Sequence, residues 1–279
     1  MSKITYISDF YVSEVAGGGE YNDDVLIREL DKIGYDVELH KSQSVRMLDI
    51  NNAEFIIISN FCLLPDVIIN QILDKKYIIY EHDHKYLLNR NPAKYKDYLA
   101  PKTEIINRQF YKNAVAVLCQ SKFHADIVKA NLELDNIVSL GGNLWSDQCY
   151  KLFEKMCVAP KDNIYAVLNS PIKHKGTKKA IHYCELSNIS YNLVADKDPL
   201  KFLEKLSAHD TFVFLPETPE TLSRVVVEAR MMGMSTKTTK NIGAIHEEWF
   251  SKKGLDLINY MRYNKQEEII NVVLEKINA

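Results

Sequence analysis

Residues 212–244 read F-V-F-L-P-E-T-P-E-T-L-S-R-V-V-V-E-A-R-M-M-G-M-S-T-K-T-T-K-N-I-G-A, and this stretch predicts the fold of the chain. Its apolar start predicts a buried strand from 211 to 215, and two prolines directly after it predict a turn. A helix with an apolar face follows, capped by Thr218 or Thr221 and ended by Gly233, and a second strand comes directly after. Strand, turn, helix and strand in this order are typical of an α/β protein with a parallel sheet.

Two carboxylates flank the start of the predicted helix. Glu220 lies in the turn, and Glu228 follows about two helical turns later on roughly the same side. A helix N-terminus offers unpaired backbone N–H groups and a partial positive charge, which suit a phosphate. Carboxylates beside it can accept hydrogen bonds from sugar hydroxyls. The combination predicts a ligand that is part polyol and part phosphate, such as a nucleotide sugar.

The spacing Glu-x7-Glu after a strand, followed by E-A-x3-G and a short strand ending in x-x-G, resembles the donor site of the retaining family-four glycosyltransferases. The resemblance implies that Glu220 faces the sugar, that Glu228 holds the ribose and that Thr221 begins the helix beside the donor. The family usually has Phe-Gly where this chain has Leu222 and Ser223, which we also assign to the donor site. A solvated amphipathic helix with two unrelated glutamates is the alternative.

A second part of the predicted donor site is N-S-P-I-K-H-K-G-T, residues 169–177. The family has an Arg and a Lys-Gly here that clamp the donor diphosphate, and Lys175 and Gly176 match the Lys-Gly. Ser170 stands where the Arg is expected, so we assign the missing charge to Lys173. An ammonium beside a leaving diphosphate stabilises developing charge, which implies a catalytic role for Lys175. A solvated loop is the alternative.

Three glycines, residues 17–19, precede Glu20 in the predicted loop after the first strand. They do not form the G-x-G-x-x-G fingerprint, but they let a ligand approach the backbone where open α/β sheets bind ligands. Related transferases have a similar loop that faces the donor–acceptor cleft. We therefore assign Gly18 and Gly19 to the donor and Glu20 to the acceptor. A flexible loop is the alternative.

The fourth expected strand is followed by Glu-His-Asp-His, residues 81–84. His-x-His can bind a metal, but no third ligand has suitable spacing. In related transferases a histidine near this place lines the sugar site, so we expect His82 or His84 to be catalytic. A surface histidine pair is the alternative. We interpret Asp-Lys-Asp at 196–198 as a surface turn, and we expect neither a metal site nor a cofactor.

Residues 85–112 contain seven basic and two acidic residues, although the whole chain has a net charge of −2. Five aromatic residues are interleaved with them: Tyr86, Tyr95, Tyr98, Phe110 and Tyr111. Basic residues neutralise phosphates and aromatic rings stack on bases, so the segment is compatible with a nucleic-acid acceptor. Lys85, Arg90 and Lys94 are the expected acceptor contacts. A solvated segment whose tyrosines pack inward is the alternative.

Alternating strands and helices along the chain predict parallel sheets with crossover helices. We expect the GT-B fold, with two Rossmann-like domains whose parallel sheets face a cleft. Residues 1–150 form the acceptor domain, 151–265 the donor domain, and 266–279 a helix that packs back towards the first domain. Residues 145–161 are expected to join the two domains.

The composition sets outer limits on the function. The chain has 279 residues, 46% of them hydrophobic and 26% charged, which are ordinary globular values. Five scattered cysteines without C-x-x-C spacing predict a reducing compartment. Neither a signal peptide nor a membrane-spanning segment is expected, so a cytoplasmic location is predicted.

The predicted function is metal-independent, retaining transfer of a sugar from a nucleoside diphosphate sugar. A phage-type enzyme that glycosylates a hydroxymethylated base in DNA is the leading acceptor hypothesis. An enzyme of surface-polysaccharide synthesis is the competing one. A degenerate nucleotide-sugar-binding module and an α/β nucleotide-binding regulator are the non-enzymatic alternatives.

Overall fold

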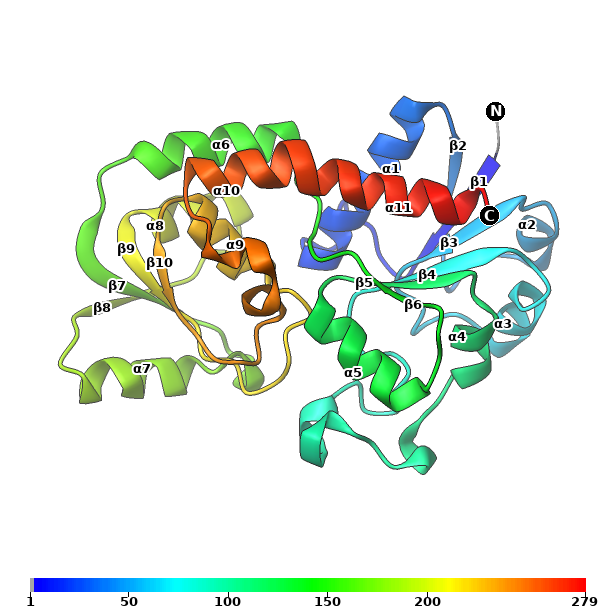
Figure 1. Cartoon of the computed structure of the whole chain (residues 1–279), viewed down its shortest axis with the longest axis horizontal. Helices are drawn as coiled ribbons and strands as arrows, with labels where there is room; N and C mark the ends of the chain where they lie inside the picture. The colour runs from blue at the N-terminus through cyan, green and yellow to red at the C-terminus, as the bar shows by residue number, and fades with distance from the viewer. Residues whose placement is uncertain (1–2) are drawn as a thin grey trace. The chain divides into compact units, whose positions relative to one another are not determined.

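The structure is a computed structural model that describes residues 3–279, and the chain forms two compact units in it (Figure 1). Unit 1 comprises residues up to Leu144 together with the C-terminal stretch from Gln266. Unit 2 comprises Trp145–Lys265. Every strand pairing in both units is parallel, so the predicted α/β fold with two parallel sheets is confirmed.

Unit 1 contains a six-stranded sheet in the order β2-β1-β3-β4-β5-β6. The strands are β1 (Lys3–Ser8), β2 (Asp36–Lys41), β3 (Phe55–Ile58), β4 (Tyr77–Glu81), β5 (Ala116–Cys119) and β6 (Ile137–Ser139). The helices are α1 (Gly18–Ile33), α2 (Met47–Asn51), α3 (Asp66–Ile72), α4 (Arg108–Asn113), α5 (Lys122–Leu132) and α11 (Gln266–Ile277). Three short 3₁₀ turns lie between β4 and α4.

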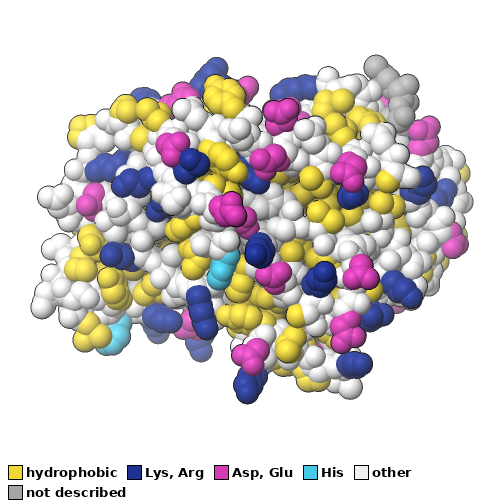
Figure 2. Space-filling view, viewed as in Figure 1, with side chains coloured by type: hydrophobic (Ala, Val, Ile, Leu, Met, Phe, Trp, Pro, Cys, Tyr) yellow, Lys and Arg dark blue, Asp and Glu magenta, His cyan; other side chains and the backbone are white. Residues whose placement is uncertain are grey.

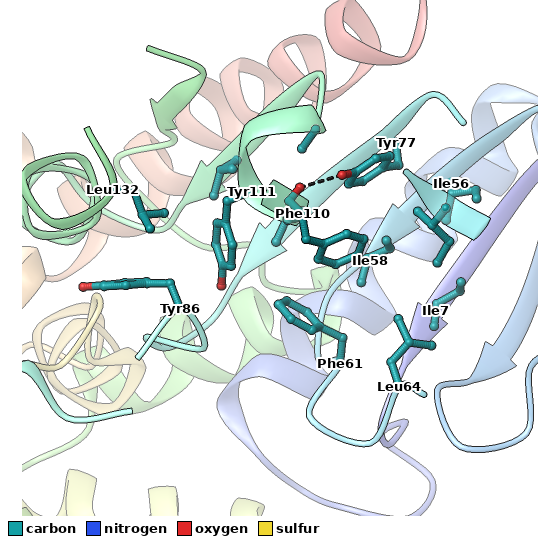
Figure 3. Packing of buried hydrophobic residues seen from close by; sticks show 14 of the residues in the cluster. Ile7, Ile56, Ile58, Phe61, Leu64, Tyr77, Tyr86, Phe110, Tyr111 and Leu132 are labelled. Atoms are coloured by element: carbon teal, nitrogen blue, oxygen red, sulfur yellow. Dashed lines mark hydrogen bonds between the residues drawn. The ribbon is translucent and has the colours of Figure 1, made fainter. Parts of the chain in front are cut away.

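Both faces of the four central strands, β1, β3, β4 and β5, are buried, and side chains alternate between the two faces along each strand. Ile56 and Ile58 of β3 belong to the core under α3, α4 and α5, whereas Ile57 belongs to the core under α1 and α11. Figure 3 shows the first of these cores, where Tyr77 donates a hydrogen bond to the carbonyl of Phe110 at 2.5 Å.

Unit 2 contains a four-stranded sheet in the order β10-β9-β7-β8. Its strands are β7 (Asp162–Leu168), β8 (Tyr191–Val194), β9 (His209–Val213) and β10 (Ser235–Lys237). Its helices are α6 (Asp147–Val158), α7 (Thr177–Leu186), α8 (Pro199–Ser207), α9 (Arg224–Met231) and α10 (Leu255–Tyr260), and α10 continues as a π-helix, Met261–Lys265. Short 3₁₀ turns lie at Lys173–Lys175, Gly243–His246 and Glu248–Ser251.

The expected linker at residues 145–161 is wrong, because most of it is helix α6. The hydroxyl of Ser146 caps this helix by accepting from the Cys149 amide at 3.3 Å. Tyr150, Phe153 and Met156 recur at the helical period and are buried in the core of unit 2. The amphipathic pattern therefore decides the structure of this segment.

Candidate functional site

The strand order of unit 2 reverses between β7 and β9. The chain runs from β7 to β8 on one side and from β9 to β10 on the other. Open α/β sheets bind ligands at the carboxyl ends of the strands at such a switch point. The two loops that leave β7 and β9 there carry most of the residues that the sequence assigned to the donor, although Glu228 lies on α9 and Gly18 and Gly19 lie in unit 1.

The loop after β7 is closed by its own hydroxyl groups. Thr177 donates to the carbonyl of Leu168 at 2.7 Å and accepts from the Ser170 amide at 3.1 Å. The Ser170 hydroxyl accepts from the Ile172 amide at 3.2 Å. Ser170, which stands at the expected arginine position, therefore shapes the turn and brings no charge. Positive charge at this loop comes from lysines instead.

A surface pocket of about 300 Å³ opens at the N-terminal end of α7. Its walls include Ser170, Thr177, Gly176 and Glu217. Three lysines also line it: Lys173, Lys178 and Lys179. The pocket therefore combines a helix N-terminus with a net positive charge, which suits a phosphate group.

Gly176 brings the two loops together. Its φ is +73°, and a Cβ there would lie 2.0 Å from the carbonyl oxygen of Leu215. The Glu217 amide also donates to the carbonyl of His174 at 2.9 Å. This backbone contact places the Lys175 ammonium 2.8 Å from Oε1 of Glu220. The structure therefore joins the two residues that the sequence assigned to the reacting end of the donor.

Glu220 lies in the turn before helix α9, as predicted, but the helix starts later than expected. The helix begins at Arg224, and neither Thr218 nor Thr221 caps it. The Glu220 amide donates to the carbonyl of Asn241 at 2.7 Å, and its carbonyl accepts from Gly243. These bonds hold the chain extended beside the segment after β10, so the helical path starts only later.

Ser223 occupies the N-cap of α9 with a φ of +72°. This left-handed conformation favours glycine, the residue that the related family has here. Its hydroxyl is buried and has no hydrogen-bond partner in the described part of the chain. Leu222 is fully buried in the core of unit 2, so only its backbone can contact a donor.

Glu228 accepts two hydrogen bonds on the same carboxylate oxygen. Trp145 Nε1 donates to Oε1 at 3.0 Å, and Arg224 Nε donates to it at 2.8 Å. Burial raises the pKa of Glu228, while Arg224 and Trp145 act in the opposite direction. Neither of these two hydrogen-bond donors to Glu228 was predicted from the sequence. The four-residue spacing of Arg224 and Glu228 was a usable signal, but Trp145 lies 83 residues away.

Unit 1 has its own switch point, between β1 and β3, and a buried polar network lies there. Nε2 of His82 is 2.6 Å from Oδ1 of Asp23, and Nδ1 is 2.5 Å from the Gln120 amide. The Ser59 hydroxyl donates to Oδ2 of Asp23 at 2.5 Å. Both ring nitrogens of His82 therefore have protein partners.

The first turn of α1 approaches this network. Gly18, Gly19 and Glu20 belong to the helix and not to the predicted loop, because Gly17 is already its N-cap. A Cβ on Gly19 would lie 3.2 Å from Cγ of His82. The Asn60 amide donates to Glu20 at 3.3 Å, and burial raises the pKa of Glu20. Ligand roles for these residues stay predictions.

His84 and Lys85 do not occupy the positions that the sequence assigned to them. His84 is 3% exposed, its ring meets the His124 ring edge-on at 5.1 Å, and burial lowers its pKa to about 4. Lys85 is 2% exposed, and its ammonium is 2.5 Å from Glu81 and 3.3 Å from Asp83. The chain turns inward after β4, so both side chains are packed inside unit 1.

The basic segment separates into buried rings and exposed cations. Tyr86, Phe110 and Tyr111 are buried in the core of unit 1, which is the inward packing given above as the alternative, so these three rings do not stack on bases (Figure 3). The remaining cations of the segment are exposed: Arg90, Lys94, Lys96, Lys102, Arg108 and Lys112. On the face displayed in Figure 2, basic and acidic side chains are interspersed.

The described residues offer neither a cluster of metal ligands nor a membrane-spanning helix. Across residues 3–279, no three His, Cys, Asp or Glu side chains gather in a way that could hold a metal ion. Within the same residues, every helix is too short or too polar to cross a bilayer.

Solved glycosyltransferase structures share the fold of this chain. HepE (Alr3699) of Anabaena, in complex with UDP and glucose, is 13% identical with a TM-score of 0.54, covering 100% of this chain and 94% of HepE. The catalytic domain of Arabidopsis thaliana starch synthase IV, bound to ADP and acarbose, is 9% identical with a TM-score of 0.57, covering 99% and 94%. An α-glucosyltransferase in complex with UDP and a 13-mer DNA containing an HMU base is 12% identical with a TM-score of 0.51, covering 99% and 93%.

No protein-family model matches the sequence, and no curated protein matches it. At these identities the structural likeness establishes the fold alone. The chain has the GT-B glycosyltransferase fold.

Proposed function

We propose that this protein transfers a sugar from a nucleoside diphosphate sugar to an acceptor hydroxyl, with retention of anomeric configuration. The observation that carries the proposal is the pair formed by Lys175 and Glu220 at the switch point of unit 2, on the same two loops as the lysine-lined pocket. The similar structures with bound UDP or ADP support a nucleotide as part of the donor.

In the proposed reaction, the bond between C1 of the sugar and the diphosphate oxygen breaks, and a bond from C1 to the acceptor oxygen forms on the same face. The acceptor proton passes to the departing phosphate oxygen. Lys175 stabilises the charge that develops on that oxygen, Glu220 holds the sugar, and Glu228 accepts hydrogen bonds from the ribose. The proposal includes no bound metal, because lysines supply the positive charge.

Replacing Glu228 with glutamine tests the donor site. Hydrogen bonds to a charged group contribute about 1.5–3 kcal/mol, so UDP or ADP should bind about ten- to a hundred-fold more weakly to Glu228→Gln. Calorimetric titration and thermal shift measure this, because a ligand raises the melting temperature by mass action. Glu204→Gln, at an exposed position of α8, is the matched control. Wild-type protein that binds no nucleoside diphosphate or its sugar ester would contradict the proposed donor site, whereas binding without any transfer would favour a degenerate nucleotide-sugar-binding module.

We further propose a hydroxymethylated base in DNA as the acceptor. Six exposed cations on residues 90–112 support this, since exposed Lys and Arg neutralise backbone phosphates. One of the structurally similar enzymes is bound to DNA with an HMU base. In a duplex, the target base would have to be extruded before transfer.

Charge reversal tests the DNA acceptor. The triple variant Lys94→Glu, Lys96→Glu and Lys102→Glu should weaken DNA binding and lower the slope of log K against log salt by about one unit for each phosphate that is no longer neutralised. Donor binding should not change. The matched control reverses three exposed lysines of unit 2: Lys151, Lys155 and Lys201. Transfer to a glycan acceptor, with DNA inert, would support the polysaccharide alternative.

A further inference from the structure

The carboxylate of Glu228 is held asymmetrically. Oε1 accepts from both the indole of Trp145 and the guanidinium of Arg224. Oε2 accepts no hydrogen bond from any residue in the described range 3–279. The side chain is 12% exposed. Within the described residues, Oε2 is not one of the buried side-chain atoms that lack a partner, so it reaches the surface of unit 2, where it can accept from a ligand hydroxyl.

The two donors also contact each other. The Arg224 guanidinium lies 4.6 Å from the centroid of the Trp145 ring, in a cation–π contact. Trp145 is fully buried, and Arg224 precedes Glu228 by one helical turn on α9. Each of the three side chains therefore fixes the other two. These contacts restrict the orientation of the carboxylate, whereas a free Glu rotates broadly about its last torsion.

We infer that Trp145 and Arg224 are positioning residues, which hold Oε1 of Glu228 so that Oε2 is presented in a fixed direction to a vicinal diol of the nucleoside. The inference rests on the proposed function, because it assumes that Glu228 meets the ribose. It goes beyond that function because it assigns part of the affinity for the ribose to Trp145 and Arg224, which do not contact the ribose themselves. Pre-orientation raises affinity because the torsional freedom is lost on folding and not on binding.

Arg224 has a second effect, on the charge of the carboxylate. Burial raises the pKa of Glu228, and the Arg224 cation opposes that rise. Another titratable group near Arg224 is Tyr150 of α6, and the Arg262 guanidinium lies 5.8 Å from the centroid of its ring. Burial raises the pKa of Tyr150 well above neutrality, so this phenol does not titrate in the working range. Without Arg224, the pKa of Glu228 should rise further. On acidification, the Glu228 carboxylate should then become protonated at a higher pH than in wild type.

The experiment compares Trp145→Phe and Arg224→Met with wild-type protein, using UDP and 2′,3′-dideoxy-UDP as calorimetric probes. Trp145→Phe keeps a ring under Arg224 but removes the N–H donor. Both variants should bind UDP about three- to ten-fold more weakly, the effect of one ordinary hydrogen bond, and should bind the dideoxy analogue as wild type does. For Arg224→Met, loss of UDP binding on acidification should begin at a higher pH than in wild type.

The matched control is Trp249→Phe, which changes the other tryptophan of the chain. This variant should leave all the measured affinities unchanged.

The outcomes separate this inference from the proposed function. Equal weakening of both nucleotides, or an unshifted pH profile in Arg224→Met, would overturn the positioning role while the donor site stands. Wild-type affinity for UDP in both variants would do the same. Wild-type protein that binds neither UDP nor any other nucleoside diphosphate would remove the proposed function, and this inference with it.

Discussion

Replacing Lys175 with alanine is expected to lower kcat by about a hundred- to a thousand-fold, the usual effect of removing one preorganised group that stabilises transition-state charge. The Lys175 backbone amide donates to the carbonyl of Ile172 at 3.0 Å, which fixes the turn. Its ammonium is 2.8 Å from Glu220 and 6.0 Å from the centroid of the Phe214 ring. The cation is therefore in place before the donor arrives, and it needs little reorganisation during the reaction.

The kinetic pattern is as informative as the size of the loss. An interaction that strengthens only as the diphosphate leaves affects kcat, whereas one present equally in the ground state affects KM. We expect kcat to fall far more than KM rises, and Lys175→Arg to restore part of the activity. Lys201→Ala, an exposed lysine of α8, is the matched control. An unchanged kcat in Lys175→Ala would remove this residue from the mechanism.

The parts of the site that were predictable from sequence are those encoded by local spacing. Lys175-Gly176 stands between a strand and a helix, and the left-handed conformation of Gly176 explains why that position needs glycine. The sequence pattern likewise placed Glu220 in the turn before α9 and Glu228 on that helix. The start of α9 was not predictable, because Ser223 adopts a conformation that a 3.6-residue periodicity does not reveal.

Interactions between distant parts of the chain were not predictable from the sequence. Trp145 donates to Glu228 across 83 residues, and no spacing rule connects them. The Asp23–His82 contact spans 59 residues. The prediction for Lys85 was wrong for a different reason. Lysine is almost never fully buried unless it is paired, so an exposed side chain was expected. Its partner, Glu81, is four residues earlier on the chain and was visible, but the inward turn after β4 was not.

Replacing Lys85 with methionine is expected to cost unit 1 about 3–5 kcal/mol of stability, the usual result of breaking a buried ion pair from one side. Glu81 is 0% exposed, and within residues 3–279 it would keep only the Tyr111 hydroxyl and the Asp83 amide as donors. Chemical denaturation of the full chain measures the loss. The exposed Lys94→Met should change stability by less than about 0.5 kcal/mol.

The loss in Lys85→Met should depend on pH in a defined direction. Burial already raises the pKa of Glu81 against the pull of Lys85, and removing the cation should raise it further. When the pKa of a carboxyl is higher in the folded state than its unfolded value of about 4.3, the free energy of unfolding falls as the pH rises from the unfolded to the folded pKa. The loss of stability should therefore be larger at pH 8 than at pH 5. Adding Glu81→Gln should recover part of it, because the amide carries no charge to bury. If Lys85→Met kept wild-type stability but bound the acceptor more weakly, Lys85 would contact the acceptor. The buried position of Lys85 after β4 would then be wrong.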